Sequence, residues 1–260
     1  MLNKKEFEKL FLDFIKELQE YCVDIENNWK IKGFIDIEKT IFSISKDTKL
    51  ISKILEIHIL PKLLELATKN GFDIVLPSSQ NYYPDLTFIY KKDNKIKYAV
   101  DIKTTFIKDS KKDYCIFTLG SHGAYFTNRQ STKNIEFPYK EYCGHFVLGI
   151  IYKQAENIDD TKIYKIEDLQ NILSVIKDLK IFFIEKWKIA NDRQGSGNTA
   201  NIGGILKKES DMINGNGIFK NDKEFNDYWM NYGKISITDE KGNIKKITKL
   251  SEFRKYKNNK

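Results

Sequence analysis

The chain has 260 residues, of which 41% are hydrophobic and 13% aromatic. This length and composition allow a large buried core and exclude a disordered or collagen-like chain. The 44 Lys and Arg against 36 Asp and Glu give a formal charge of +8. Binding to a polyanionic partner such as nucleic acid would explain this charge, and a merely Lys-rich composition would explain it about equally well.

Cysteine usage and hydropathy indicate the compartment. Cys22, Cys115 and Cys143 are odd in number and widely spaced, which is not a disulfide framework and favours a reducing interior. The N-terminal stretch has no signal-peptide pattern, and no run approaches the roughly 18 apolar residues of a membrane span. We therefore expect a cytoplasmic protein with no membrane partner.

Apolar periodicity predicts the helices. Helical spacing of apolar residues predicts a helix over 4–19 and a second over 50–70, which Pro61 is expected to kink. A third helix is expected over 167–178 and a short one around 222–231. The first two together make a helical N-terminal part of the chain.

Most of the chain after the second predicted helix has strand character. Six β-branched or aromatic runs bounded by polar turns predict strands over 72–77, 85–91, 96–103, 114–119, 145–153 and 181–189. No repeat and no Pro-, Gly- or Ser-rich linker divides the chain. The pattern therefore predicts one α/β domain, with a mixed central β-sheet flanked by helices.

The basic excess is concentrated at the C-terminus. Residues 241–260 carry eight Lys or Arg and one acid, Glu252. Such a segment is either a solvated tail or an arm that contacts phosphates.

Two aspartates and a lysine interrupt the predicted strands. Asp85 begins one strand, and Asp101 and Lys103 lie on the next, where alternation places them on one face. A short loop between the strands makes a hairpin, so Asp85 is expected to lie near Asp101. The three charged groups should therefore converge.

Such a convergence suits phosphodiester hydrolysis. One or two carboxylates plus a substrate phosphate are the usual ligands of Mg²⁺, and a lysine beside them can orient water or offset developing charge. As a pattern, Pro-Asp…Asp-x-Lys is weak, because alternating charges on an exposed strand are common. Glu56 adds a third acid, which the helical wheel places inside the apolar stripe between Leu63 and Ala67.

Two amide-rich loops are candidates for reading bases. The segment Gly195-Ser196-Gly197-Asn198-Thr199-Ala200-Asn201 follows a predicted strand, but no long helix follows it, so a dinucleotide site is not favoured. Amides and hydroxyls there suit base edges, although an ordinary surface loop is the alternative. Ser79-Gln80-Asn81 is a similar loop just before Asp85.

The chain as a whole resembles type II restriction endonucleases of the PD-(D/E)xK nuclease superfamily. The stretches that carry the resemblance are Asp47-Thr48-Lys49, QNYYPD (80–85), VDIKTT (100–105), FTLG (117–120), TKNI (132–135), GSGNTANIG (195–203) and GIF…EF.DYW.NY (217–232). The resemblance implies a single restriction-endonuclease-like domain over 1–260 that acts as a homodimer. Within it, we expect an N-terminal helix and dimerisation region (1–48), a catalytic core (49–190), and a recognition loop with a C-terminal basic region (191–260).

The resemblance also implies roles for individual residues. Asp85 and Asp101 would be metal ligands, Lys103 the catalytic lysine and Glu56 a supporting catalytic carboxylate. The residues expected to contact the major groove are Gly195, Ser196, Gly197, Asn198, Thr199 and Asn201. Those expected at the minor groove are Gln80 and Asn81, and those expected to touch the DNA backbone or couple recognition to catalysis are Thr48, Lys49, Thr104, Thr105 and Lys133.

The implied activity is Mg²⁺-dependent cleavage of double-stranded DNA at the palindrome GATATC. The cut would be blunt and central, leaving 5′-phosphate and 3′-hydroxyl ends, and a cognate DNA methyltransferase is expected in the same host without forming a stable complex. Two alternatives remain open at this stage. One is a structure-directed or sequence-nonspecific repair or recombination nuclease with the same active site, and the other is a non-catalytic DNA-binding protein.

Overall fold

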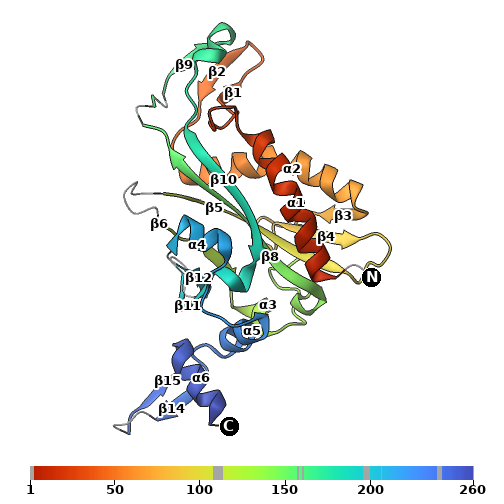
Figure 1. The fold of residues 1–260 in the computed structure, drawn as a ribbon, viewed down its shortest axis with the longest axis vertical. Helices are drawn as coiled ribbons and strands as arrows, with labels where there is room; N and C mark the ends of the chain where they lie inside the picture. The colour runs from red at the N-terminus through yellow and green to blue at the C-terminus, as the bar shows by residue number, and fades with distance from the viewer. Residues whose placement is uncertain are drawn as a thin grey trace.

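A five-stranded mixed sheet forms the middle of the molecule (Figure 1). Its strands, in spatial order, are β10 (Ile176–Glu185), β8 (Tyr142–Gln154), β5 (Lys97–Phe106), β4 (Leu86–Tyr90) and β3 (Phe72–Val75). Only β5 and β8 pair in parallel, and the other neighbours are antiparallel. The computed structural model describes residues 3–107, 114–156, 158–159, 161–195, 200–205, 207–238 and 242–259.

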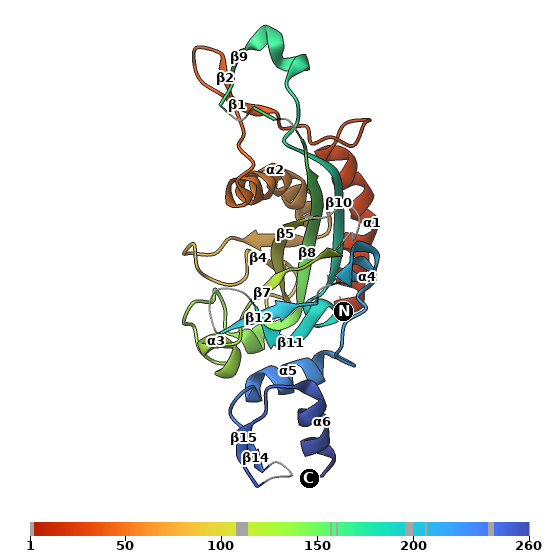
Figure 2. The ribbon, with the colours of Figure 1, turned by 90° about the vertical axis from the view of Figure 1, so that its left-hand side faces the viewer.

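Two long helices pack against this sheet. Helix α1 (Lys4–Cys22) begins at a capping box between Asn3 and Glu6, and Figure 2 shows it running alongside β10. Helix α2 (Thr48–Lys69) begins at the side-chain cap of Asp47 and continues past Pro61. Apolar faces of both helices enter one hydrophobic cluster with the sheet, which is the burial that stabilises amphipathic helices in proteins.

Aromatic side chains fill the centre of that cluster. Phe7 of α1 stacks on Tyr98 of β5 with ring centroids 4.1 Å apart, and Phe11 stacks on Phe183 of β10 at 3.9 Å. The side chains of Val100 and Ile102 on β5 belong to the same cluster. Because neighbours along a strand point to opposite faces, Ala99 belongs to a second cluster on the other face.

The second cluster joins the sheet to the C-terminal half of the chain. It is built around a small sheet of β11 (Ala190–Gln194), β12 (Asn201–Gly204) and β7 (Thr118–Ser121). The short helices of this region are α3 (Ala124–Thr127), α4 (Glu209–Asn214) and α5 (Asp222–Asn231), and β6 (Tyr114–Cys115) pairs with β13 (Lys207–Lys208). The expected short helix around 222–231 is confirmed.

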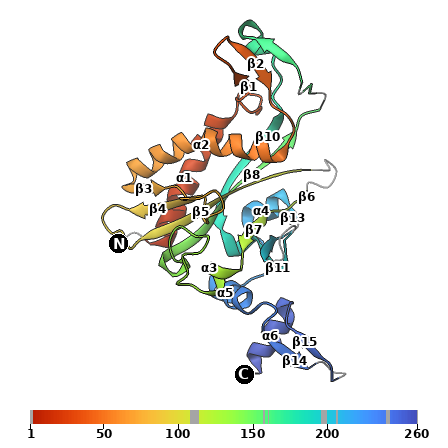
Figure 3. The ribbon, with the colours of Figure 1, turned by 180° about the vertical axis from the view of Figure 1, so that it is seen from behind.

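Two small units stand at opposite ends of the molecule (Figures 1 and 3). One is a sheet of β1 (Gly33–Ile35), β2 (Thr40–Ser43) and β9 (Ile163–Lys165). The other contains the hairpin of β14 (Ser236–Thr238) and β15 (Ile244–Lys246) with helix α6 (Leu250–Asn258). No helix in the described ranges is both long and apolar enough to cross a membrane.

The helix predicted over 167–178 is wrong. Residues Ile166–Asn171 form a 3₁₀ helix, and β10 has begun at Ile176. Asp178 has a φ of +52°, which an α-helix does not allow. Val175 and Ile176 are buried, so apolar residues that we grouped on a helical face reach the core from extended backbone instead.

One other prediction needs correction, and one of the two alternatives for the C-terminal segment is limited by the structure. The single strand predicted over 114–119 is split into β6, which pairs with β13, and β7, which pairs with β12. The C-terminal basic segment is not a solvated tail throughout, since Leu250 and Phe253 of α6 are buried. Arg254 of the same helix forms an ion pair with Glu224 of α5 at 2.8 Å.

Candidate active site

The hairpin of β4 and β5 brings the two aspartates together. Leu86 pairs with Val100 across the two antiparallel strands. Asp85 immediately precedes Leu86, and Asp101 immediately follows Val100, so the two carboxylates lie opposite one another on one face of the sheet. The apolar neighbours Leu86 and Val100 point to the other face, into the helix-covered core.

Lys103 and the main chain of β5 hold this pair. Lys103 Nζ lies 2.8 Å from Asp101 Oδ2 and 3.6 Å from Asp85 Oδ2. The main-chain N–H of Ile102 donates a hydrogen bond of 2.7 Å to Asp85 Oδ2. The side chain of Asp101 is 5% exposed and that of Asp85 36%, so Asp85 is the acid that faces solvent.

The two carboxylates differ in their electrostatics. Burial raises the pKa of Asp85 to about 7, with the Lys103 ammonium opposing the rise and the Asp101 carboxylate adding to it. Burial alone would also raise the pKa of Asp101, but the ammonium groups of Lys103 and Lys186 outweigh it and hold that pKa below its usual value. Likewise, the carboxylates overcome the effect of burial on Lys103 and raise its pKa. The site therefore keeps Asp101 and Lys103 charged.

A cavity of about 360 Å³ opens over this group. It is lined by Ser52, Glu56, Asp85, Ile102, Lys103, Thr104, Ile116, Phe117 and Thr118. Glu56 reaches it from α2 with a side chain that is 25% exposed and paired to Lys53 at 2.9 Å. Glu56 is thus partly buried beside the apolar face of α2, where its carboxylate lines the cavity and is paired with Lys53.

A larger adjoining cavity of about 860 Å³ contains several of the residues predicted to contact DNA. Thr48, Lys49, Gln80 and Thr104 line it, together with Glu56 and Asp85. The two cavities share lining residues and so form one continuous hollow beside the acids. Three other predicted residues, Asn81, Thr105 and Lys133, are described in the structure but line neither cavity.

The predicted base-reading loop starts and ends near the same hollow. The N–H of Gly195 donates to the carbonyl of Asn201 at 2.8 Å, which closes the loop between β11 and β12. A side chain at Gly195 would lie 3.0 Å from Thr118, a residue that lines the smaller cavity. Ser196, Gly197, Asn198 and Thr199 lie outside the described residues.

Lys186 is a charged residue of this region that was not among those predicted from the sequence. It begins the 3₁₀ helix Lys186–Ile189 after β10 and is 1% exposed. The available signal was a lysine inside the apolar run IFFIEKW (181–187), an interruption of the same kind as those that singled out Asp101 and Lys103.

The donor set fits a hard divalent cation. Two carboxylates on one face supply oxygen ligands of the type that Mg²⁺ prefers, and substrate phosphate and water commonly complete its shell. Asp101 Oδ2 lies 2.8 Å from Lys103 Nζ in an ion pair but has no hydrogen-bond partner among the described residues, which leaves this buried oxygen available to a cation. In the described part of the chain, no group of three or more His, Cys, Asp or Glu residues could hold a metal by itself.

A mixed sheet flanked by helices, with two aspartates and a lysine at one hairpin, defines a restriction-endonuclease-like protein. The family model of the restriction endonuclease EcoRV matches residues 25–258. The chain is 36% identical over 235 residues to the type II restriction enzyme EcoRV of Escherichia coli. The aligned residues make up 90% of this chain and 93% of that relative. The chain therefore belongs to the EcoRV restriction endonuclease family and is a homologue of site-specific deoxyribonucleases.

Proposed function

We propose that the protein is a Mg²⁺-dependent, homodimeric type II restriction endonuclease that cuts double-stranded DNA at GATATC. The cut is blunt, at the centre of the site, and leaves 5′-phosphate and 3′-hydroxyl ends. The observation that carries this proposal is the Lys103 ammonium lying within 3.6 Å of both Asp85 and Asp101 at an open cavity. Family membership supports an endonuclease over a non-catalytic DNA-binding protein.

In this proposal the three charged residues have separate roles. Asp85 and Asp101 would hold the divalent cation, and the Ile102 N–H fixes the orientation of Asp85. Lys103 directs its ammonium toward the scissile phosphate and offsets the negative charge that develops there. When bound, Mg²⁺ supplies polarisation of the phosphodiester and makes a water molecule more acidic. Glu56 acts from the cavity wall as a supporting carboxylate.

DNA recognition is assigned to residues around the hollow. Gly195 to Thr199 and Asn201 read the major groove, where amides and hydroxyls distinguish base edges, and Gln80 and Asn81 enter the minor groove. Thr48, Lys49, Thr104, Thr105 and Lys133 contact the backbone or connect recognition to the acids. The central TA step of GATATC is easily deformed, which allows bending to contribute to specificity.

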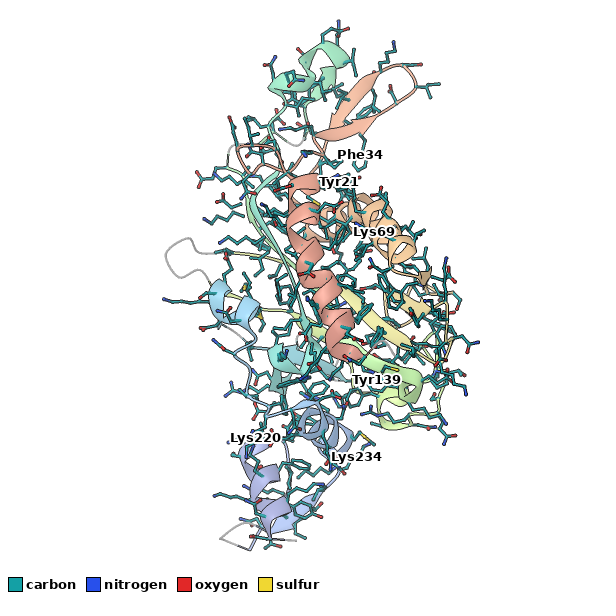
Figure 4. All side chains as sticks on the ribbon, turned by 45° about the vertical axis from the view of Figure 1, so that its right-hand side comes forward. Tyr21, Phe34, Lys69, Tyr139, Lys220 and Lys234 are labelled. Atoms are coloured by element: carbon teal, nitrogen blue, oxygen red, sulfur yellow. The ribbon has the colours of Figure 1, made fainter. Side chains whose placement is uncertain are left out.

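An exposed apolar ridge supports the proposed homodimer. Phe34, Phe42 and Ile163 are direct partners across β1, β2 and β9, so their side chains share one face. They are 45%, 42% and 60% exposed, and such a group of large apolar side chains marks an interaction surface. Figure 4 shows Phe34 at the end of the molecule remote from Lys220 and Lys234. A two-fold dimer through this end matches the symmetry of a palindrome.

Digestion of plasmid DNA tests the proposal. The protein with Mg²⁺ should give discrete fragments whose sequenced ends fall at the centre of GATATC, and EDTA should prevent cutting. A smear would favour the sequence-nonspecific nuclease, and discrete fragments ending elsewhere would refute the assigned site. A host that makes this enzyme is expected to protect its own sites with a cognate DNA methyltransferase, without a stable complex.

A further inference from the structure

The amino group of Lys186 is buried behind the active site. The residue is 1% exposed, and its Nζ has no hydrogen-bond partner among the described residues. It lies 4.7 Å from the centroid of the Tyr83 ring, a cation–π contact. Lys188, two residues further on, differs because it is paired with Glu8 at 3.1 Å.

The surroundings of this amino group connect it to the aspartates. Tyr83 is two residues from Asp85, and its hydroxyl is hydrogen-bonded to His145 Nδ1 at 2.9 Å. A side chain at Gly120 of β7 would lie 3.6 Å from Lys186 Nζ, so β7 encloses the group on another side. A buried ammonium needs a counter-charge, and Asp101, itself 3% exposed, is the carboxylate within electrostatic reach.

Two lysine ammonium groups lie near the two aspartates before any cation binds. Burial lowers the pKa of Lys186 to about 8, with Asp101 opposing that effect, so the amino group is mainly charged at neutral pH. The ammonium groups of Lys103 and Lys186 therefore at least match the negative charge of Asp101 and the partly ionised Asp85. Charges away from water interact more strongly than exposed ones, so Lys186 resists the addition of a further cation.

We propose that Lys186 is a positioning residue that acts through Asp101 to weaken divalent-cation binding until the DNA phosphate contributes its negative charge. This inference rests on the proposed function, because it assumes the cation site at Asp85 and Asp101. No reacting group touches Lys186, so it is not a catalytic residue. The affinity for the divalent cation therefore depends on bound DNA, because the negative phosphate offsets the positive charge that the cation adds.

Calcium binding to the full-length protein measures this effect without relying on activity. Titration calorimetry at pH 7, with no DNA, compares the unaltered protein with Lys186→Met and Lys186→Gln, both of which remove the charge. We expect Ca²⁺ to bind on the order of tenfold more tightly to both variants. Lys188→Met is the matched control and should leave the affinity unchanged.

Other outcomes overturn the inference. Unchanged or weaker Ca²⁺ binding by the folded Lys186 variants would overturn it. If Lys186→Met does not fold, Lys186→Gln decides, and failure of both would assign Lys186 to the core alone. Cleavage of DNA by the unaltered protein separates the two proposals. If that protein cuts DNA but the Lys186 variants bind Ca²⁺ with unchanged affinity, only the role of Lys186 is refuted. If it does not cut and neither it nor the variants bind Ca²⁺, the proposed function is refuted as well.

Discussion

The main-chain N–H of Ile102 donates a 2.7 Å hydrogen bond to the carboxylate of Asp85, which immediately precedes the neighbouring strand β4. The first acid is therefore held by the backbone of the strand that carries the second acid and the lysine. The arrangement depends on the β4–β5 hairpin more than on any long side chain. Single substitutions of these residues should thus change the chemistry while the sheet remains folded.

Replacement of Asp101 by Ala should abolish DNA cleavage while specific DNA binding in Ca²⁺ survives. The bound cation contributes several kcal/mol to catalysis, so we expect a loss of about a thousandfold or more. Single-turnover cleavage and gel-shift assays measure the two effects. Asp73→Ala is the matched control, because Asp73 lies on the adjacent strand β3 and pairs with Lys91 at the surface. Retained cutting by Asp101→Ala would contradict the metal assignment.

Asp85→Asn should alter how stability depends on pH. Burial raises the pKa of Asp85 to about 7, above the roughly 3.9 of an unfolded chain. The folded state therefore binds this proton more tightly, and the stability that it contributes is lost as pH rises from about 4 through 7. Asn carries no charge, so the metal-free variant should gain stability relative to the unaltered protein between pH 4 and pH 8.

Urea denaturation in EDTA at the two pH values measures that difference. The free energy of unfolding is compared between the variant and the unaltered protein at each pH. An equal difference at pH 4 and pH 8 would refute the pKa assigned to Asp85.

Asn198→Ala should weaken site preference. A bidentate contact between a side chain and a base contributes about 1–3 kcal/mol of discrimination, so cleavage at the preferred site should fall roughly 5- to 150-fold relative to a variant site. Asn216→Ala is the control, because that amide is bonded to Asp211 near the end of α4. Plasmid digestion followed by end sequencing measures the preference, and an unchanged fragment pattern and rate would exclude a base-reading role for Asn198.

Phe42→Glu should convert the proposed dimer to monomers. Phe42 is the middle member of the apolar ridge, with Phe34 and Ile163 as its strand partners. A charge placed there would have to be buried without a partner in a dimer interface. Sedimentation equilibrium measures the mass, and Leu12→Glu, at an exposed position on α1 that is 55% accessible, should leave it unchanged. A dimeric Phe42→Glu protein would place the interface elsewhere.

Sequence pattern was sufficient to predict those helices and strands that form mainly by burying apolar side chains. The spacing of Phe7 and Phe11 marks α1 because a helix that buries one face needs an apolar residue about every 3.6 positions. Strand runs were recognised from β-branched and aromatic residues, and motif resemblance was enough to indicate the nuclease family. The helix predicted over 167–178 is wrong because apolar spacing alone does not distinguish a helix from extended backbone that enters a core.

The sequence by itself determined the α/β class, the family and the candidate trio of Asp85, Asp101 and Lys103. Only the tertiary structure decided that Glu56 faces a cavity beside Lys53, and that the buried Lys186 amino group has no hydrogen-bond partner in the described part of the chain. The physical reason is that periodicity and motifs report neighbours along the chain. Electrostatic environment and cavities depend on side chains that are far apart in sequence, such as Tyr83 and Lys186, and these meet only when the sheet is assembled.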